Sequence, residues 1–286
     1  MTAPNNWGRW GADDERGTLN ILLPEHVRHA ASLVKTGRVF SLGLDLSPEA
    51  PKTPTRNALW HRASKTERPG PAMSSADDLI LMHTHTATHL DALCHVWVDG
   101  ALYNGYPSSE IDHTGAPRNG VHNVQSIAGR GVLLDVARLR GVDYLEPGQA
   151  ISAAELDAVA RAQAVEIRPG DIVLVRTGWI QMLTRDRARF DRMDEPGPGR
   201  DTVEWFRQHE LIALGADNCA VEVLPPEDGI QMAVHVGVIR DLGGYLIEYL
   251  DLEELAAARV YEFLFVLAPL RLVRGIGSPV NPIAIA

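Results

Sequence analysis

The chain has 286 residues, of which 45% are apolar and 22% are charged, and this balance is typical of a globular protein with a sizeable core. Its formal net charge of −10 argues against nucleic acid and against an anionic membrane surface as partners, because both require a basic footprint. Two cysteines are too few for a disulfide framework, so we expect a reduced, cytoplasmic protein.

Helical and strand-like patterns are mixed along the whole chain. In chain order, they predict a helix over 24–35, strands over 39–46, 79–83 and 132–136, a helix over 152–162, a strand over 171–176, a helix over 200–209, a strand over 211–216, helices over 229–242 and 252–259, and a strand over 260–267. The apolar stretch 260–273 contains Glu262 and Arg271 and is too short to cross a membrane. This mixture predicts an α/β fold in one domain over residues 1–286.

Two stretches are poor in apolar residues. Residues 47–78 carry five prolines and several serines, and residues 185–201 are dense in charge with two Pro-Gly pairs. Strong core patterns resume on both sides of each stretch, which indicates surface excursions rather than linkers between domains. Either excursion could cover an active site, although a plain solvated loop is the simpler interpretation.

The most informative segment is a cluster of histidines. His83, His85, His89 and His95 fall within 13 residues, and Asp91 lies among them. Imidazole and carboxylate groups so close together are the ligands that Zn²⁺ or Mn²⁺ prefers. On a strand, all these odd-numbered residues would face one side, whereas a helix would turn Asp91 away from His85.

A straight strand does not satisfy the same ligands. It would hold His85 and His89 about 13 Å apart, too far to share one ion with bonds of about 2 Å. The chain must therefore bend near Ala87, and we expect a strand that runs into a tight loop. We expect His83 to be a neighbour of the ligands or a surface residue, and Cys94 to be a packing residue.

Two other interpretations of the cluster remain open at this point. His89, Asp91 and a distant histidine such as His235 match the 2-His-1-carboxylate triad of non-haem Fe(II) oxygenases, with His85 and His95 surplus. The cluster could also be a structural metal site in a non-catalytic protein. Structural zinc sites are usually closed by four ligands and rich in cysteine, so an open catalytic site is the better match.

The segment resembles the signature of the cyclase family of metal-dependent hydrolases, which includes kynurenine formamidases and isatin hydrolase. The family motif H-x-G-T-H-x-D-x-P-x-H corresponds here to HTATHLDALCH, residues 85–95, with Ala87 in place of Gly and Leu93 in place of Pro. Further stretches resemble the longer members of the family: WGRWGADDERGTLN, GDIVLVRTGW, LGADNCAVE, HVGVIRDLGGYLIEYLDLEEL and GSPVNP.

The resemblance implies a fold, a site and an activity. The fold would be a swivelling β/β/α arrangement, with a mixed sheet or barrel-like β core and flanking helices. The site residues would be His85, His89 and Asp91 as metal ligands, His95 as the general acid/base, His235 and Glu248 as ligands of a second ion, and Trp7 and Trp10 as an aromatic wall for the substrate.

The implied reaction is hydrolysis of a C–N or C–O bond in a small amide or ester, cyclic substrates included. One or two divalent ions, Zn²⁺ or Mn²⁺, would activate the water, and the protein would form a homodimer or homotetramer. Taken alone, His235 and Glu248 are weaker candidates, because each lies in an apolar run where a buried, hydrogen-bonded role is the simpler explanation.

Overall fold

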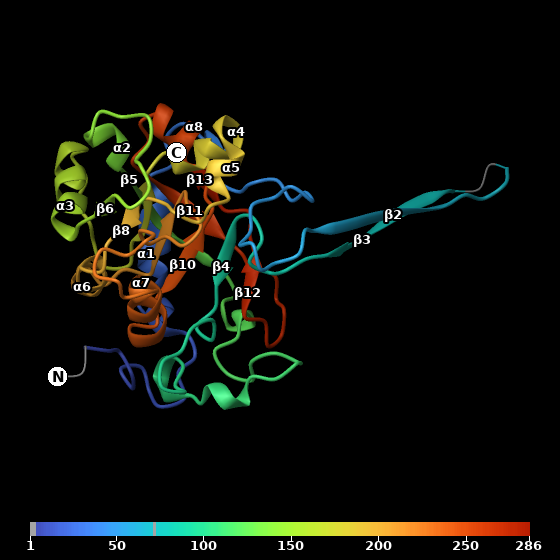
Figure 1. Ribbon diagram of the computed structural model, residues 1–286, viewed down its shortest axis with the longest axis horizontal. Coiled ribbons are helices and arrows are strands. Elements are labelled where there is room, and N and C mark those ends of the chain that lie inside the picture. Colours follow the sequence, from blue (N-terminus) through green and yellow to red (C-terminus); the bar gives the residue numbers. More distant parts are fainter. Residues whose placement is uncertain (1–3, 71–72) are drawn as a thin grey trace.

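The computed structural model describes residues 4–70 and 73–286. Its main feature is a nine-stranded mixed sheet that curls into a half-barrel flanked by helices (Figure 1). In spatial order the strands are β1 (Val39–Ser41), β13 (Ile283–Ile285), β11 (Glu262–Leu267), β5 (Ile127–Asp135), β7 (Ile172–Arg176), β9 (Ala213–Ala216), β10 (Tyr245–Glu248), β4 (His89–Asp91) and β12 (Gly277–Pro279). The predicted α/β class and the mixed, barrel-like core are thereby confirmed.

The centre of the sheet is parallel and its two flanks are antiparallel. β5, β7, β9 and β10 pair in parallel, whereas β4 and β12 continue the sheet antiparallel beyond β10. The residues of β7, β9 and β10 are buried throughout, as expected for strands covered on both faces.

Helices cover the sheet and close its ends. Their bounds are α1 (Pro24–Ser32), α2 (Val136–Leu139), α3 (Ala153–Ala162), α4 (Met182–Arg185), α5 (Arg187–Phe190), α6 (Thr202–Gln208), α7 (Ala233–His235) and α8 (Glu253–Ala257). Helix α1 packs on β5 and β11, and α3 begins as predicted, with the Ser152 hydroxyl accepting a hydrogen bond from the Glu155 N–H. In the described part of the chain, every helix is too short or too polar to cross a bilayer.

Several predicted boundaries differ from the structure. The strand predicted over 39–46 ends at Ser41. Beyond it the Leu42 N–H donates to the Pro282 carbonyl, but the Leu42 carbonyl accepts from the Asp251 N–H and the Leu44 N–H donates to the Thr88 hydroxyl. The helix predicted over 229–242 begins only at Ala233 and continues as a π-helix over Val236–Asp241. In the second excursion, residues 195–199 are buried and include β8 (Gly197–Pro198), which pairs with β6 (Ala150–Ile151).

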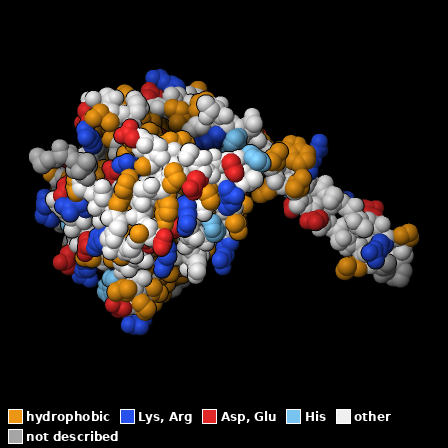
Figure 2. Space-filling view, turned by 90° about the horizontal axis from the view of Figure 1, so that it is seen from below, with side chains coloured by type: hydrophobic (Ala, Val, Ile, Leu, Met, Phe, Trp, Pro, Cys, Tyr) orange, Lys and Arg blue, Asp and Glu red, His pale blue; other side chains and the backbone are white. Residues whose placement is uncertain are grey.

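The first excursion forms an arm rather than a plain loop. β2 (Trp60–Thr66) and β3 (Ser75–Leu81) pair antiparallel, and all 14 of their residues are exposed. Figure 1 shows this arm extending away from the body, and Figure 2 shows hydrophobic side chains gathered where it leaves the body. The strand predicted over 79–83 thus starts earlier, at Ser75, and ends at Leu81.

Candidate metal centre

The histidine segment enters the sheet through a bend at Ala87. The φ of Ala87 is +54°, a left-handed value that costs a residue with a Cβ roughly 1 kcal/mol, and its N–H donates to the Pro51 carbonyl. The bend brings the rings of His85 and His89 to a centroid distance of 5.1 Å. The bent segment that the spacing predicted is confirmed.

Asp91 is the centre of the cluster. Its carboxylate is fully buried, with Oδ1 3.4 Å from His85 Nε2, 3.6 Å from His89 Nε2 and 4.0 Å from His95 Nε2. Its other oxygen, Oδ2, is 3.7 Å from His235 Nε2. Four imidazoles, three from the segment 85–95 and one from His235, therefore face one carboxylate.

Two further carboxylates complete the arrangement. Glu248, at the end of β10, has Oε1 3.1 Å from His235 Nε2 and Oε2 3.0 Å from His89 Nε2. Glu222 lies behind His235 and accepts a hydrogen bond of 2.6 Å from Nδ1 and another of 3.1 Å from the backbone N–H of His235. The antiparallel pairing of β4 with β10 sets His89 directly opposite Glu248, so the sheet register itself brings the ligands together.

The cluster fits a divalent metal ion. His85 Nε2, His89 Nε2 and both oxygens of Asp91 are buried without a hydrogen-bond partner, although such groups are normally satisfied in a protein interior. The 3.0 Å approach of His89 to Glu248 lacks the geometry of a hydrogen bond. Two groups have ligand atoms within 4.8 Å of one another, namely His85, Asp91 and His95, and His89, Asp91 and Glu248.

Burial and neighbouring charges separate the pKa values of the histidines. Burial and the adjacent imidazoles lower the pKa of His85 far below its usual range. Burial alone would lower the pKa of His89, but the negative charge of Glu248 outweighs it, so the pKa of His89 is raised. For His235, burial is outweighed by hydrogen bonds to Glu222 and Glu248, which raise its pKa to about 10. At both residues the neighbouring carboxylates favour binding of a proton, with which a metal ion at the same atoms would compete.

His95 differs from the other histidines in its exposure. Its side chain is 21% exposed, its ring stacks on that of His85 at 4.3 Å, and burial lowers its pKa, so it is neutral at pH 7. His83 is exposed and lies outside the cluster. Cys94 is buried, and burial raises its pKa to about 12, as for an inert packing residue.

The two predicted aromatic residues lie in the N-terminal segment. The Trp7 indole N–H donates to the Arg240 carbonyl at 2.8 Å, with the Arg240 guanidinium over its ring. Trp10 lies beneath the guanidinium of Arg9. Within the described residues, none of these contacts joins either tryptophan to the histidine cluster, and their role toward substrate stays a prediction.

Three residues that support the site were not identified from the sequence. Besides Glu222, Arg56 donates to the His85 carbonyl at 2.6 Å, and a Cβ at Gly277 would lie 2.5 Å from His85 Nε2. Glu222 and Gly277 belong to the stretches LGADNCAVE and GSPVNP, for which the sequence indicated no role. Arg56 lies in the first excursion, 47–78, where no sequence motif indicated a functional residue.

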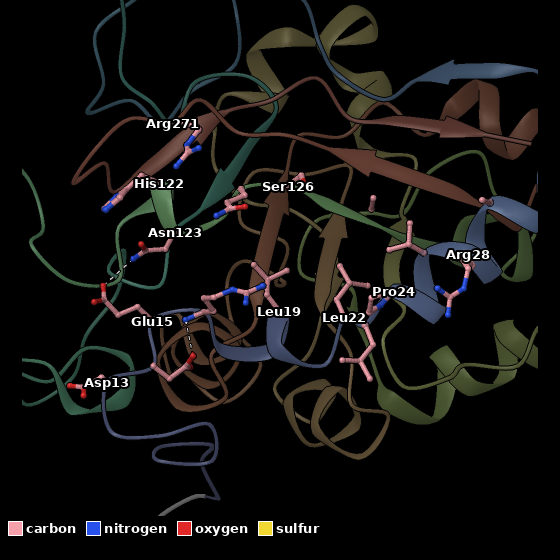
Figure 3. A pocket seen from close by; sticks show the side chains of 17 residues that line it. Asp13, Glu15, Leu19, Leu22, Pro24, Arg28, His122, Asn123, Ser126 and Arg271 are labelled. Carbon is pink, nitrogen blue, oxygen red and sulfur yellow. Dashed lines mark hydrogen bonds between the residues drawn. The ribbon is translucent and has the colours of Figure 1, made fainter.

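A separate cavity of about 960 Å³ is lined by residues of the segment 13–31, which includes α1, and by residues of 122–128 and Arg271 (Figure 3). Its lining is a mixture of apolar and charged side chains, and Glu15 accepts hydrogen bonds there from Asn123 and Arg118. It contains none of the cluster residues, and we assign the chemistry to the histidine cluster, which has unpaired ligand atoms.

The fold and the site together define an α/β protein whose curled sheet buries a cluster of histidines and carboxylates that could hold a metal ion. The Cyclase family model matches residues 33–223, about two thirds of the chain and including His85 to His95. The chain belongs to the Cyclase family, which confirms the resemblance seen in the sequence.

Similar proteins extend the comparison beyond the family model. Isatin hydrolase from Roseibium aggregatum is 25% identical over 249 residues, covering 85% of this chain and 86% of that protein. A novel cyclase of known crystal structure is 37% identical, with a TM-score of 0.92, and the match covers 99% of this chain and 100% of that chain. An isatin hydrolase bound to the product analogue thioisatinate shares the fold. It has 21% identity and a TM-score of 0.65, and the match covers 87% of this chain and 92% of that chain.

Proposed function

We propose that this protein is a metal-dependent hydrolase that cleaves a C–N or C–O bond in a small amide or ester, cyclic substrates included. The observation that carries the proposal is the set of buried, unpartnered Nε2 and carboxylate atoms around Asp91. The names of the relatives, isatin hydrolase and cyclase, support the same class of reaction. Zn²⁺ or Mn²⁺ suits these donors, and because Asp91 belongs to both ligand groups, these residues would hold one or two ions.

A bound divalent ion lowers the pKa of a water toward 7 and polarises a carbonyl. Residues of this chain would bind the ion and transfer the proton. His85, His89 and Asp91 would hold the ion, and His235 and Glu248 would be ligands of a second ion. His95, neutral at pH 7 and open to solvent on one side, accepts a proton from the attacking water and returns it to the leaving nitrogen or oxygen.

Arg56 points to the kind of product. Its guanidinium is held beside the site by the His85 carbonyl, and within the described part of the chain no carboxylate pairs with it. Hydrolysis of an amide or ester produces a carboxylate, which a guanidinium binds with paired N–H donors. We therefore include Arg56 as the residue that receives the new carboxylate.

The competing interpretations use less of the site. An Fe(II) triad of His89, Asp91 and His235 would leave His85 and His95 without a role, although both face Asp91. A structural metal would be enclosed by its ligands, whereas the His95 side chain is open to solvent.

The test is turnover of a panel of lactams, lactones, esters and formamides by the purified protein, before and after chelation and after reloading with Zn²⁺ or Mn²⁺. We expect chelator-sensitive hydrolysis that needs no dioxygen. His95→Ala should keep its metal and lose about 10²–10⁴-fold in kcat. His83→Ala, in the same segment but exposed, is the matched control and should behave like the wild type.

The alternatives give different results. Oxygen-dependent turnover would identify an oxygenase, and a metal-replete protein inactive on every substrate class would indicate a structural site. If His95→Ala lost its metal, His95 would be a metal ligand rather than the acid/base residue. Its ligand atom does lie within 4.8 Å of those of His85 and Asp91.

A further inference from the structure

The cavity beside α1 lies apart from the metal centre. Its volume of about 960 Å³ is in the upper part of the range found for small-molecule sites. Its lining comes from residues of 13–31 and 122–128 and from Arg271, and no residue of the histidine cluster is among them (Figure 3). A molecule bound in this cavity would therefore not touch the metal centre.

One wall of the cavity is an apolar stripe along α1. Leu23, Val27 and Ala31 are spaced four residues apart, so they lie on one face of the helix and its N-terminal flank, and all three line the cavity. Leu19 and Leu22 extend the same wall. Leu23 is 45% exposed and Val27 is 36% exposed, so the described chain leaves this stripe partly uncovered. Such a wall suits the apolar body of a ligand.

The acidic side chains of the lining are mostly occupied by groups of the chain itself. Asp14 accepts a hydrogen bond of 2.9 Å from the Tyr103 hydroxyl, and further bonds from a backbone N–H and a side-chain amide. Glu15 pairs with Arg118 at 3.0 Å and also accepts from a backbone N–H and a side-chain amide. Among residues 4–70 and 73–286, Asp13 is the one carboxylate of the lining without such a partner. The lining therefore offers little to a cation.

The arginine side chains of the lining are unpaired. Arg16, Arg28 and Arg271 line the cavity, and within the described chain their guanidinium groups make neither an ion pair nor a hydrogen bond. In Figure 3, the side chains of Arg271 and Arg28 lie on either side of Leu19 and Leu22. Three unpaired guanidinium groups thus accompany a single unpaired carboxylate. The cavity is locally positive in a chain whose formal net charge is −10.

We propose that this cavity is a second binding site, and that it takes a small organic anion with an apolar body and one carboxylate or sulfonate group. The body would lie against the stripe of Leu23 and Val27, and the oxyanion would accept paired N–H bonds from the guanidinium groups. An uncharged ligand would leave the arginines without a partner, and a cationic ligand would meet like charge. The inference does not depend on the proposed activity, because the site lies outside the metal centre.

The experiment compares two fluorescent probes on the full-length protein. Anilinonaphthalene sulfonate is an apolar ring system with one anionic group, and phenylnaphthylamine has the same rings without the charge. Arg16→Gln, Arg28→Gln and Arg271→Gln combined should weaken binding of the anionic probe by about 10–100-fold, because charge-assisted hydrogen bonds are lost. The same triple variant should bind the neutral probe within about two-fold of the wild type. Val27→Asp should weaken binding of both probes, because it places a charge in the apolar wall.

A matched control removes the same charge elsewhere. All six arginines are exposed, so the fold should tolerate both triple variants, and Arg68→Gln, Arg161→Gln and Arg259→Gln combined should leave binding of both probes unchanged. Naphthoate, an aromatic carboxylate, should displace the anionic probe from the wild type. The proposal would be overturned if the anionic probe bound the first triple variant as tightly as the wild type, or if the control variant lost the same affinity. Equal losses for the neutral and anionic probes in the first triple variant, or unchanged binding by Val27→Asp, would also overturn it.

Discussion

Asp91→Asn is the substitution that tests the metal centre most directly. The two side chains have nearly the same shape, but asparagine removes the negative charge that four imidazoles face at 3.4–4.0 Å. Losing one partner of a buried charge pair costs about 3–5 kcal/mol, which corresponds to a rise in the metal dissociation constant of about 10²–10³·⁵-fold. The protein should remain folded and bind the ion poorly.

Thermal unfolding with and without metal measures this loss. At a metal concentration of 100 times the wild-type dissociation constant, the ion stabilises the wild type by about 2.7 kcal/mol, or about 5–10 °C in Tm. At the same concentration, Asp91→Asn should gain about 0.4 kcal/mol or less, a shift of about 1–2 °C at most. Metal analysis of the purified variant should show the same loss.

Asp171→Asn is the control for general loss of stability. Asp171 is also a buried carboxylate, but it pairs with Arg130 at 2.6 Å and belongs to neither metal group. Its substitution should lower Tm without reducing the shift that metal produces. If Asp91→Asn kept the full metal-induced shift, the assignment of Asp91 as a shared ligand would be refuted.

Three further outcomes follow from the neighbours of the site. Glu222→Gln should weaken metal binding by about 10–100-fold in a calorimetric titration, because Glu222 orients His235; unchanged affinity would exclude that role. Gly277→Ala should displace His85 and lower metal affinity, and a crystal structure of the variant with His85 unmoved would contradict this. The raised pKa of His235 means that, in the presence of a chelator, its proton stabilises the fold fully below pH 6.5. This contribution should be lost as pH rises toward about 10, and His235→Gln should flatten that part of the profile of Tm against pH.

The local geometry of the histidine segment was predictable because it depends on spacing alone. Residue parity excluded a helix and the reach of a metal bond excluded a straight strand, so a bend near Ala87 was required. The structure places a left-handed residue at that position. The start of the helix over 153–162 was equally predictable, since the Ser152 hydroxyl caps it by accepting a hydrogen bond from the Glu155 N–H.

The other features of the site and of the fold depend on pairing between segments that are distant in the sequence. The convergence of His235 and Glu248 on the cluster follows from β10 lying beside β4, a contact that no local pattern encodes. The resemblance supplied it, because it aligned both residues with metal ligands of the family. The arm escaped prediction because WHRASKT lacks alternating apolar residues, and its strand conformation comes from the pairing with β3.

The position of β4 has a consequence for how the protein is made. β4 is hydrogen-bonded on one side to β10 and on the other to β12, which begins at Gly277, almost 190 residues after His89. During synthesis the N-terminal half emerges first, with His85, His89 and Asp91 but without the strands that enclose them. The cluster is therefore enclosed only after β10 and β12 have been made, so a metal ion that it holds would be captured late in folding.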